Sequence, residues 1–355
     1  PYYGASGIID YVNDFIFDDD LILLGEDGAN ILARSSRLSF KVSGKLWVNN
    51  HAHVLKPKEG FDIDFLNDYL ESLDYRKYNT SIAQPKLNKA ECQRIPIAVP
   101  NYDEQVKIGR ILTTWDNAIA NSEKLIDQLK LRKKGLMQQL LSGKKRLKGF
   151  DGEWRTVKLG DISERITQKN DELNDNVVTI SAQRGFVKQE DFFNKRVASK
   201  TLSGYYLLKK GQFAYNKSYS NGYPMGAFKR LDDFEKAVVT TLYICFKIKE
   251  DKIDSDFIQN YFEGGLLIKG LMRIAQEGGR AHGLLNISLG DFFGLELKIP
   301  SLEEQKAIAQ VLNEADKEIS FQERKLESLI DEKKGLMQQL LTCLLYTSPS
   351  PRDRS

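Results

Sequence analysis

The nine-residue string KKGLMQQLL occurs twice in this chain, at Lys133–Leu141 and again at Lys333–Leu341. The repetition extends well beyond the string. Aligned at one offset without gaps, Pro100–Leu141 and Pro300–Leu341 are identical at 18 of 42 positions. Unrelated segments of average composition would share roughly one position in twenty. The chain therefore contains an internal duplication, which decides how the whole fold is organised.

The repeated segments have the pattern of long amphipathic helices. Each copy opens with proline, a polar capping residue and a glutamate three positions later, which is typical of a helix start. Apolar residues then recur at spacings of four and three, which predicts a coiled-coil seam over about five heptads. The seam positions are Ile108, Leu112, Trp115, Ile119, Ile126, Leu129, Leu136 and Leu140 in copy one and Ile308, Leu312, Ile319, Leu326, Leu329, Leu336 and Leu340 in copy two.

Polar residues interrupt the two seams at matching places. Ser122 and Lys133 in the first copy correspond to Gln322 and Lys333 in the second. Such residues lower stability but help to fix register, so the two lysines are candidates for register or partner docking rather than for phosphate contacts. We expect each helix, about 58 Å long at 1.5 Å per residue, to pack against the other. Two independent helices lying on separate domains are the alternative, and packing leaves parallel or antiparallel pairing open.

Two globular segments, Tyr2–Val99 and Trp154–Ile299, separate the helices. Short alternating runs between turn residues predict strands, as at Leu21–Leu24, Lys45–Leu55, Ala237–Ile248 and Leu295–Ile299. A helix is predicted at equivalent places in each, over Phe61–Ser72 and Ile253–Gly264. Each segment then ends in a Leu-Asn loop, at Leu87-Asn88 and Leu285-Asn286, followed by a strand into proline. The globular segments are therefore distant copies that diverged more than the helices.

Bulk composition indicates a soluble globular protein. The 355 residues allow two to three domains, with 41% hydrophobic and 28% charged residues, and no apolar run approaches a membrane span of roughly 18 residues. The three dispersed cysteines fit neither a disulfide framework nor a metal site, so a cytoplasmic protein is expected. Net charge is only +3, but Lys130–Lys158 holds ten Lys/Arg against two acids. This cluster indicates phosphate contacts or, equally, a solvated helix end and linker.

Motifs for catalysis and metal binding are missing from the sequence. There is no Pro-Pro pair, so the catalytic loop of amino-methyltransferases is absent, and there is no glycine-rich phosphate loop followed by Lys and Ser or Thr. His51 and His53 share one face of a predicted strand, but two imidazoles without Cys or carboxylate neighbours make a poor metal site. We interpret the histidines as polar residues of the strand face rather than as metal ligands.

Several motifs resemble the DNA-specificity subunits of type I restriction–modification systems. They include IP-x₂-VP-x₃-EQ at Ile95–Gln105, its twin KIP-x₃-EQ at Lys298–Gln305, the KKGLMQQLL helix ends and GEWRTVKLGDI at Gly152–Ile162. LLGEDGAN (Leu23–Asn30) and SGKLWVNNHAHVL (Ser43–Leu55) are similar to signatures of the first domain, and YNKSYSNGYPMGAFKR (Tyr215–Arg230) to those of the second. The resemblance covers nearly the whole chain.

The resemblance implies a fold and a set of partners. The fold is α+β, with two mixed α/β target-recognition domains joined by two long helices that pack as an antiparallel coiled coil with pseudo-twofold symmetry. Each domain reads one half of a bipartite site in double-stranded DNA, and the helices set the gap. Two methyltransferase subunits bind the helices and transfer methyl from S-adenosylmethionine to adenine. Restriction subunits, with ATP and magnesium, supply the nuclease. The specificity subunit itself is non-catalytic, binds no cofactor or metal, and has no membrane partner.

The expected domain boundaries follow the repeat. Residues 1–99 form the first recognition domain, 100–150 the first helix with a basic linker, 151–299 the second recognition domain and 300–342 the second helix. The first domain has no equivalent of GEWRTVKLGDI, so we expect it to be incomplete at its N-terminal side. Residues 343–355, CLLYTSPSPRDRS, resemble a translated adaptor and are expected to be a non-native tail.

Candidate DNA-reading residues are polar side chains in loops. Arginine and lysine fit guanine edges, and asparagine and glutamine fit adenine edges, although phosphate contacts are usually more numerous. In the first domain the candidates are Tyr3, Ser6, Asp27, Asn30, Arg34, Arg37, Asn49, Asn50 and His51. In the second they are Gln183, Arg184, Asn216, Lys217, Tyr219, Lys229, Gln276, Arg280 and His282. For any one of them an ordinary surface or turn role is the alternative, and Tyr215 and Trp47 could be core aromatics.

Two other functions fit parts of the sequence. A coiled-coil scaffold with protein-binding heads would use the same helices, and DNA binding by the purified complex distinguishes it from a DNA-recognition subunit. A fused methyltransferase or nuclease would need motifs that the sequence lacks. The sequence leaves open the DNA site and its spacer length, the activity of the chain, the presence of a restriction subunit and the native C-terminus.

Overall fold

Two compact units make up this chain. The computed structural model describes residues 1–81, 84–193, 198, 201–275 and 284–341. Unit 1 comprises Pro1–Ile126 and the described part of Phe321–Ser355, and unit 2 comprises Asp127–Ser320. Each unit therefore contains one globular domain together with part of each of two long helices. Among the described residues, no helix is both long and apolar enough to cross a membrane.

The two repeated segments form the long helices. Helix α4 spans Tyr102–Leu140 and helix α10 spans Leu302–Leu341. Their first turns are capped as the sequence predicts: the Glu104 amide donates to Asn101 Oδ1 at 3.1 Å, and the Glu304 amide donates to Ser301 Oγ at 3.3 Å. The caps satisfy amides that have no partner inside the helix, which fixes where each helix begins.

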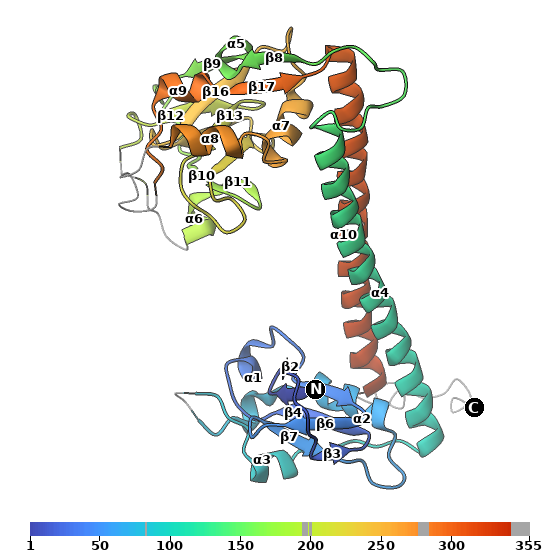
Figure 1. The fold of residues 1–355 in the computed structure, drawn as a ribbon. Helices are drawn as coiled ribbons and strands as arrows, with labels where there is room; N and C mark the ends of the chain where they lie inside the picture. The colour runs from blue at the N-terminus through green and yellow to red at the C-terminus, as the bar shows by residue number, and fades with distance from the viewer. Residues whose placement is uncertain (82–83, 194–197, 199–200, 276–283, 342–355) are drawn as a thin grey trace, which may run out of the picture. The chain divides into compact units, whose positions relative to one another are not determined.

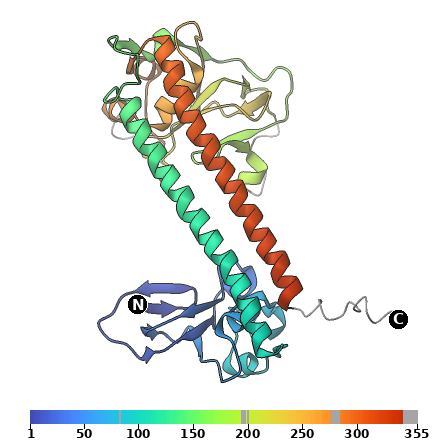
Figure 2. The same cartoon turned by 90° about the vertical axis from the view of Figure 1, so that its right-hand side faces the viewer.

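Within each unit the helices run antiparallel. In unit 2 the C-terminal part of α4 lies beside the N-terminal part of α10 (Figure 1). Lys133 Nζ on α4 is 2.5 Å from Asp316 Oδ1 on α10. In unit 1 the N-terminal part of α4 lies beside the C-terminal part of α10 (Figure 2). Lys333 Nζ on α10 is 2.7 Å from Asp116 Oδ2 on α4. The expected α+β fold with paired antiparallel helices is therefore confirmed.

Unit 1 holds two small sheets and a covering helix. One sheet has the strand order β2 (Gly7–Asp10), β1 (Tyr2–Gly4), β6 (Lys45–Val48), β3 (Phe17–Asp18). The other has the strand order β5 (Ser39–Val42), β4 (Leu21–Gly25), β7 (Ala52–Leu55). Helix α2, Ile63–Ser72, packs on β4 and β5. Its Phe65 joins Ile22 and the helix residues Ile108, Leu112 and Leu341 in one buried cluster. The shorter elements are α1 (Asn30–Ala33), η1 (Tyr75–Tyr78) and α3 (Lys89–Gln93).

Unit 2 repeats this plan with additional strands. Its main sheet has the order β14-β13-β16-β9, from Ala227–Arg230, Phe213–Asn216, Ile244–Ile248 and Ser163–Ile166. Three strand pairs accompany it: β10 (Val178–Ser181) with β11 (Gly185–Lys188), β12 (Tyr206–Lys209) with β15 (Lys236–Val239), and β17 (Glu296–Ile299) with β8 (Arg155–Lys158). The helices are α5 (Leu159–Ile162), α6 (Gln189–Phe193), α7 (Ser255–Glu263), α8 (Ile268–Ile274) and α9 (Leu289–Phe293). Phe213, Phe246, Phe257 and Phe292 are fully buried in its largest core cluster.

A buried glutamine joins each domain to its long helix. Gln105 Oε1 accepts from the Asp62 amide at 3.0 Å, and Gln305 Oε1 accepts from the Asp254 amide at 2.9 Å. Each Nε2 also donates to the proline carbonyl five residues earlier. Asp62 and Asp254 cap α2 and α7. In both motifs the residue after the proline therefore caps the long helix, and the glutamine joins the domain to it.

Two features of the strands differ from the sequence expectation. The runs Lys45–Leu55 and Ala237–Ile248 each break into two strands around a short loop, at residues 49–51 and 240–243. The expected strand before Pro100 does not form, whereas β17 forms before Pro300. That expectation was wrong because β17 pairs with β8, and within the described part of unit 1 residues 95–99 have no pairing strand.

Candidate nucleic-acid interface

Three loops of unit 1 meet at one end of its sheets. Strands β1 and β6 run parallel, with Tyr2 opposite Trp47 and Tyr3 opposite Val48, so their C-terminal ends coincide. The Asn49 amide donates to the Tyr3 carbonyl at 3.0 Å. The Glu26 amide, after β4, donates to the His51 carbonyl at 2.9 Å. The sequence candidates gathered around this end are Tyr3, Ser6, Asp27, Asn49, Asn50 and His51.

Hydrogen bonds order this loop cluster. His51 Nδ1 lies 2.8 Å from Asp27 Oδ2, and the imidazole remains half exposed. Lys86, which the sequence reasoning missed, forms an ion pair with Glu26 at 3.2 Å. The backbone of Lys86 also forms an isolated antiparallel β-bridge with Asp27. Burial, and to a smaller extent the nearby Tyr11, raises the pKa of the Tyr3 hydroxyl, so this group is a neutral donor at physiological pH. The cluster thus presents imidazole, amide and hydroxyl groups of the kinds that contact base edges.

The remaining candidates of unit 1 make internal contacts. Arg34 donates to the Glu71 carboxylate at 2.8 Å and to its carbonyl at 2.5 Å. Arg37 pairs with Asp68 at 3.0 Å on α2 and with Asp116 at 3.2 Å on α4. The Asn30 side chain bonds to residues 35–37 and shapes that loop. These three side chains hold the loop against α2 and α4.

Unit 2 builds the matching loop cluster from different residues. The Leu285 amide donates to the Lys217 carbonyl at 3.1 Å, as the Leu87 amide donates to the Glu26 carbonyl at 2.7 Å in unit 1. Lys217 therefore occupies the position in unit 2 that Glu26 occupies in unit 1. Asn216 Oδ1 accepts from the Ser218 amide at 3.0 Å and shapes the start of the loop, and Tyr219 is 66% exposed beyond it.

The turn between β10 and β11 borders the same loop. Gln183 Nε2 donates to the Asn221 carbonyl at 3.1 Å, which joins the two loops. The exposed Arg184 guanidinium lies 6.0 Å from the centre of the Phe192 ring. Gln183 and Arg184 are therefore brought together with residues 216–219. The candidates Gln276, Arg280 and His282 lie outside the described residues.

Lys229 has a structural environment. Its side chain is 90% buried, it forms an ion pair with Glu263 on α7, and its ammonium lies 5.1 Å from the centre of the Tyr223 ring. The Tyr223 hydroxyl donates to the same Glu263 carboxylate at 2.8 Å, and burial followed by that carboxylate raises the pKa of the hydroxyl. Lys229 on β14 and Tyr223 in the loop thus tie the loop to Glu263 on α7.

A second segment of unit 2 was missed by sequence reasoning. Residues 240–242 follow β15 as residues 49–51 follow β6, and Leu242 there is 55% exposed. The Leu242 amide donates to Thr240 Oγ1 at 3.3 Å. The available signal was the equivalence of β6 and β15 within the duplication, because Thr-Thr-Leu by itself does not resemble a DNA-reading loop.

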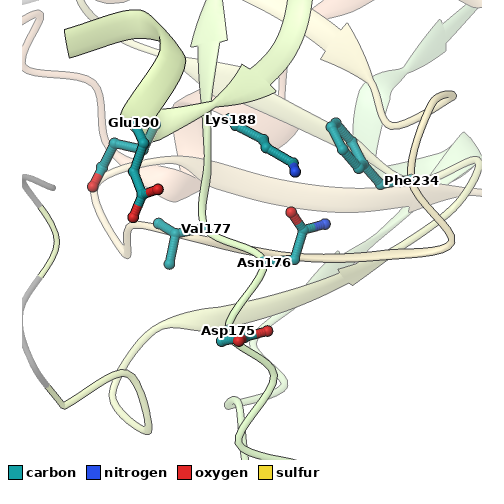
Figure 3. Close-up of a pocket in the computed structure, with 7 residues that line it drawn as sticks. Asp175, Asn176, Val177, Lys188, Glu190 and Phe234 are labelled. Atoms are coloured by element: carbon teal, nitrogen blue, oxygen red, sulfur yellow. The ribbon is translucent and has the colours of Figure 1, made fainter. Parts of the chain in front are cut away.

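Two cavities of unit 2 are less suited to phosphate. One of about 700 Å³ contains Gln183 and Arg184, but its other cations pair with carboxylates, such as Lys133 with Asp316 and Arg230 with Asp256. Another, of about 570 Å³, is lined by Asp175, Asn176, Lys188 and Glu190 (Figure 3). Figure 3 shows the Lys188 side chain near the Asn176 amide, with Glu190 across the pocket beyond Val177 and Asp175 below Asn176. Two carboxylates against one cation repel a phosphate, so the loop cluster is the better candidate.

The basic segment 130–158 is partly neutralised. Arg146 makes a two-pronged ion pair with the buried Glu304, with both N–O distances 2.6 Å, and lies 5.8 Å from the Trp154 ring centre. Lys133 pairs with Asp316. These two cations have structural roles, while Lys144, Lys145 and Lys148 are exposed beyond the end of α4. All fifteen residues assigned to the helix seam from the sequence are buried or half-buried.

A family model described as "Type I restriction modification DNA specificity domain" matches residues 1–131 and 151–330. The MjaVIII specificity subunit of Methanocaldococcus jannaschii, a type I restriction enzyme subunit, is 28% identical over 287 residues, covering 73% of this chain and 64% of the relative. A putative type I restriction enzyme specificity subunit of Haemophilus influenzae is 38% identical over 112 residues, covering 32% of this chain and 29% of the relative. The chain thus spans less than two thirds of these relatives.

Solved structures share the fold. The crystal structure of a type I restriction–modification S subunit from M. genitalium superposes with a TM-score of 0.55 at 14% identity, covering 96% of this chain and 88% of that one. A chain from a study of complex assembly in the type I system gives a TM-score of 0.51 at 13% identity, covering 90% and 81%. At these identities the likeness shows the architecture alone.

Proposed function

Because this chain belongs to the type I restriction–modification DNA specificity family, we propose that each unit reads one half of a bipartite site in double-stranded DNA. The observation that carries the proposal is the repeated loop cluster. Both units join the loop after β4 or β13 to a later segment through the same backbone bond, at Leu87 and at Leu285. One cluster contains Asp27, Asn49 and His51, whereas the other contains Lys217 and Thr240. A common framework with different polar side chains supports two different half-sites.

The chemistry of the side chains gives each cluster a role. Amides such as Asn49 pair with adenine edges, and Lys217 and Arg184 pair with guanine edges or with phosphates. The exposed lysines 144, 145 and 148 add charge that would favour any nearby phosphate backbone. We therefore expect base reading by the loops and a general electrostatic contribution from the linker.

The catalytic chemistry belongs to partner subunits under this proposal. The part of the chain that the structure describes holds no group of three or more His, Cys, Asp or Glu residues able to bind a metal. S-adenosylmethionine would be bound by two methyltransferase subunits that dock on the paired helices and methylate adenine. ATP and magnesium would be bound by restriction subunits. This chain would supply sequence recognition and the docking frame.

Mapping adenine methylation tests the proposal. The chain is co-expressed with its methyltransferase subunit in a methylation-free host, and modified sites are read by sequencing. Asn49→Ala should relax the base preference of one half of the motif, and Arg184→Ala that of the other half. If the side chain contacts a base, each change should reduce the discrimination between bases by about 1–3 kcal/mol. Lys247→Ala, far along β16 from the loops, serves as a matched surface control. A complex that shows no DNA binding at low salt would favour the protein-binding scaffold instead.

A further inference from the structure

An imidazole and a carboxylate meet in the loop cluster of unit 1. His51 lies between β6 and β7, Asp27 follows β4, and His51 Nδ1 is 2.8 Å from Asp27 Oδ2. The Asp27 side chain is 19% exposed, whereas the His51 side chain is 51% exposed. The carboxylate is thus largely covered, while the ring that it holds reaches solvent. Within the described residues the second ring nitrogen, Nε2, has no hydrogen-bond partner.

Backbone bonds hold both residues in place. The Glu26 amide donates to the His51 carbonyl at 2.9 Å, and the His51 amide donates to Asn49 Oδ1 at 2.9 Å. The backbone of Asp27 forms its β-bridge with Lys86. The two side chains are therefore ordered before any ligand arrives, which lowers the entropy cost of a contact made by the ring.

Neighbouring charged and titratable groups leave Asp27 to His51. The Lys86 ammonium pairs with Glu26 at 3.2 Å. His53 Nε2 donates to a backbone carbonyl at 2.7 Å, and His53 Nδ1 is 3.7 Å from Glu26. Both groups therefore face Glu26 or a carbonyl, and the Asp27 carboxylate acts on His51.

The carboxylate decides which nitrogen of the neutral His51 ring carries the proton. An ionised Asp27 can only accept hydrogen bonds, so Nδ1 must be the donor between them. A neutral imidazole has a single N–H, which leaves Nε2 as a bare acceptor on the exposed side of the ring. Phosphate oxygens are acceptors as well, so this nitrogen requires a different partner, one that donates.

Donors in the DNA major groove are exocyclic amino groups. Adenine presents N6 and cytosine presents N4, whereas guanine presents O6 and N7 and thymine presents O4, which are acceptors. We propose that His51 accepts a hydrogen bond from the amino group of an adenine or cytosine, and that Asp27 is a positioning residue that sets the ring tautomer for this contact. The proposal rests on the proposed function of unit 1, to which it adds the class of base that is read.

The duplicated position in unit 2 shows that the fold does not require this pair. Ser218 occupies the position of Asp27, because each forms the isolated β-bridge that follows β13 or β4. The registers of β4 with β7 and of β13 with β16 place Leu242 at the position of His51. Serine and leucine cannot form a carboxylate–imidazole pair, yet the equivalent loops form. This favours a role of the pair in binding over a role in folding.

Nitrogen NMR of the full chain tests the tautomer without DNA. The chain has three histidines, and His51→Gln identifies the signals of the His51 ring. At a pH where the nitrogen shifts show a neutral ring, the parent should carry the proton on Nδ1. Asp27→Asn should populate the tautomer protonated on Nε2, because the new amide can donate to Nδ1. A parent ring with its proton on Nε2 would overturn the proposal.

Base preference tests the contact itself. Methylation by the purified complex with its methyltransferase subunit is compared at the same pH on duplexes that carry each base at each half-site position. The parent should prefer adenine or cytosine at one position, and His51→Ala should reduce that preference by about fivefold or more. Asp27→Asn should instead admit guanine or thymine at the same position, because Nε2–H can donate to their oxygens.

Two controls separate a positioning role from a structural one. Base preference in the half-site read by unit 2 should be unchanged in both variants. Asp18→Asn removes an exposed carboxylate at the opposite end of β6 and should behave like the parent. Rates that fall equally for all four bases in His51→Ala and Asp27→Asn would make the pair structural and overturn the proposal. A parent complex that binds no DNA would overturn the proposed function itself, and the reading by His51 with it.

Discussion

Lys333 Nζ lies 2.7 Å from Asp116 Oδ2, and the duplicated pair repeats it, with Lys133 2.5 Å from Asp316. Both lysines come from the repeated string in the last turns of one helix, and both aspartates from the first half of the opposite helix. Each pair therefore joins α4 to α10 within one unit and specifies antiparallel pairing. Lys333 is buried and also approaches Asp68 at 3.4 Å, whereas Asp316 is half exposed. The two pairs are equivalent in sequence but not in environment.

Asp116→Asn should destabilise unit 1 more than Asp316→Asn destabilises unit 2. Asp116→Asn leaves Lys333 and Arg37 sharing Asp68, so one positive charge of this cluster is uncompensated. We expect a loss of about 2 kcal/mol for this change and of less than about 1 kcal/mol for Asp316→Asn, because an exposed pair is screened. Urea unfolding of each variant measures the difference. Asp116→Asn combined with Lys333→Met should recover part of the loss, because Arg37 and Asp68 then remain as one balanced pair. An unchanged midpoint for Asp116→Asn would refute the role of the pair.

Gln305→Leu should loosen unit 2 at its junction with α10. The glutamine is fully buried, and leucine of similar size leaves the Asp254 amide and the Pro300 carbonyl without partners, at a cost of about 2–3 kcal/mol. Thermal unfolding followed by hydrogen exchange should show the loss in unit 2 with unit 1 unaffected. The neighbouring exposed Lys306→Ala is the control, and equal stability of the two variants would contradict the clamp.

Lys217→Ala and Lys229→Ala should have opposite signatures. Lys217 lies in the loop cluster, so its removal should weaken DNA binding in a titration at fixed salt and leave the unfolding midpoint within about 0.5 kcal/mol. Lys229 neutralises Glu263 beside Tyr223, so its removal should lower stability by about 1–3 kcal/mol. Equal DNA affinity for Lys217→Ala and the parent would remove Lys217 from the interface.

Cys245 should resist alkylation until unit 2 unfolds. Burial raises the pKa of its thiol to about 12 from an ordinary value of 9.0. Between these values the unfolded chain loses the thiol proton and the folded chain keeps it, so this group makes stability fall as pH rises through that range. Removing it by Cys245→Ala should reduce the slope of stability against pH by up to about 1.4 kcal/mol per unit. Rapid labelling by iodoacetamide at pH 8 in the native chain would contradict the burial.

Matched insertions in α4 and α10 test whether the helices set the half-site spacing. Seven residues added after Lys124 and seven after Arg324 preserve the heptad register and extend each helix by about 10 Å. We expect the methylated motif to keep both half-sites and to gain about three base pairs of spacer, at 3.4 Å per step. The same insertion in α4 alone breaks the register and serves as the control. An unchanged spacer in the matched variant would rule out the spacing role.

Local pattern was sufficient to predict the helices and their approximate bounds. The caps at Asn101 and Ser301 and the four-three apolar spacing act within a few residues, so they can be recognised without knowledge of the fold. Equivalent domain helices were also predicted, at Phe61–Ser72 and Ile253–Gly264. They form at Ile63–Ser72 and Ser255–Glu263, and Asp62 and Asp254 cap them locally. The candidate loops were predicted only as a group, since polar residues in turns have many uses.

Pairing across the fold decided which candidates share a surface. Arg34, Arg37 and Lys229 have the right chemistry for DNA but bind Glu71, Asp68 and Glu263, and nothing in the local sequence names those partners. Lys86 and residues 240–242 have no distinctive sequence but are brought to the loop clusters by strand pairing.

The sequence by itself determined the duplication, the two long helices and the family, because each depends on identity or periodicity along the chain. Tertiary structure decided that the helices pair antiparallel, since the seam fits either direction and only the Lys333–Asp116 and Lys133–Asp316 pairs select one. Tertiary structure also decided that residues 95–99 form no strand, whereas the corresponding residues Glu296–Ile299 form β17. A strand exists only with a partner, and the partner of β17 comes from a segment about 140 residues away in the sequence.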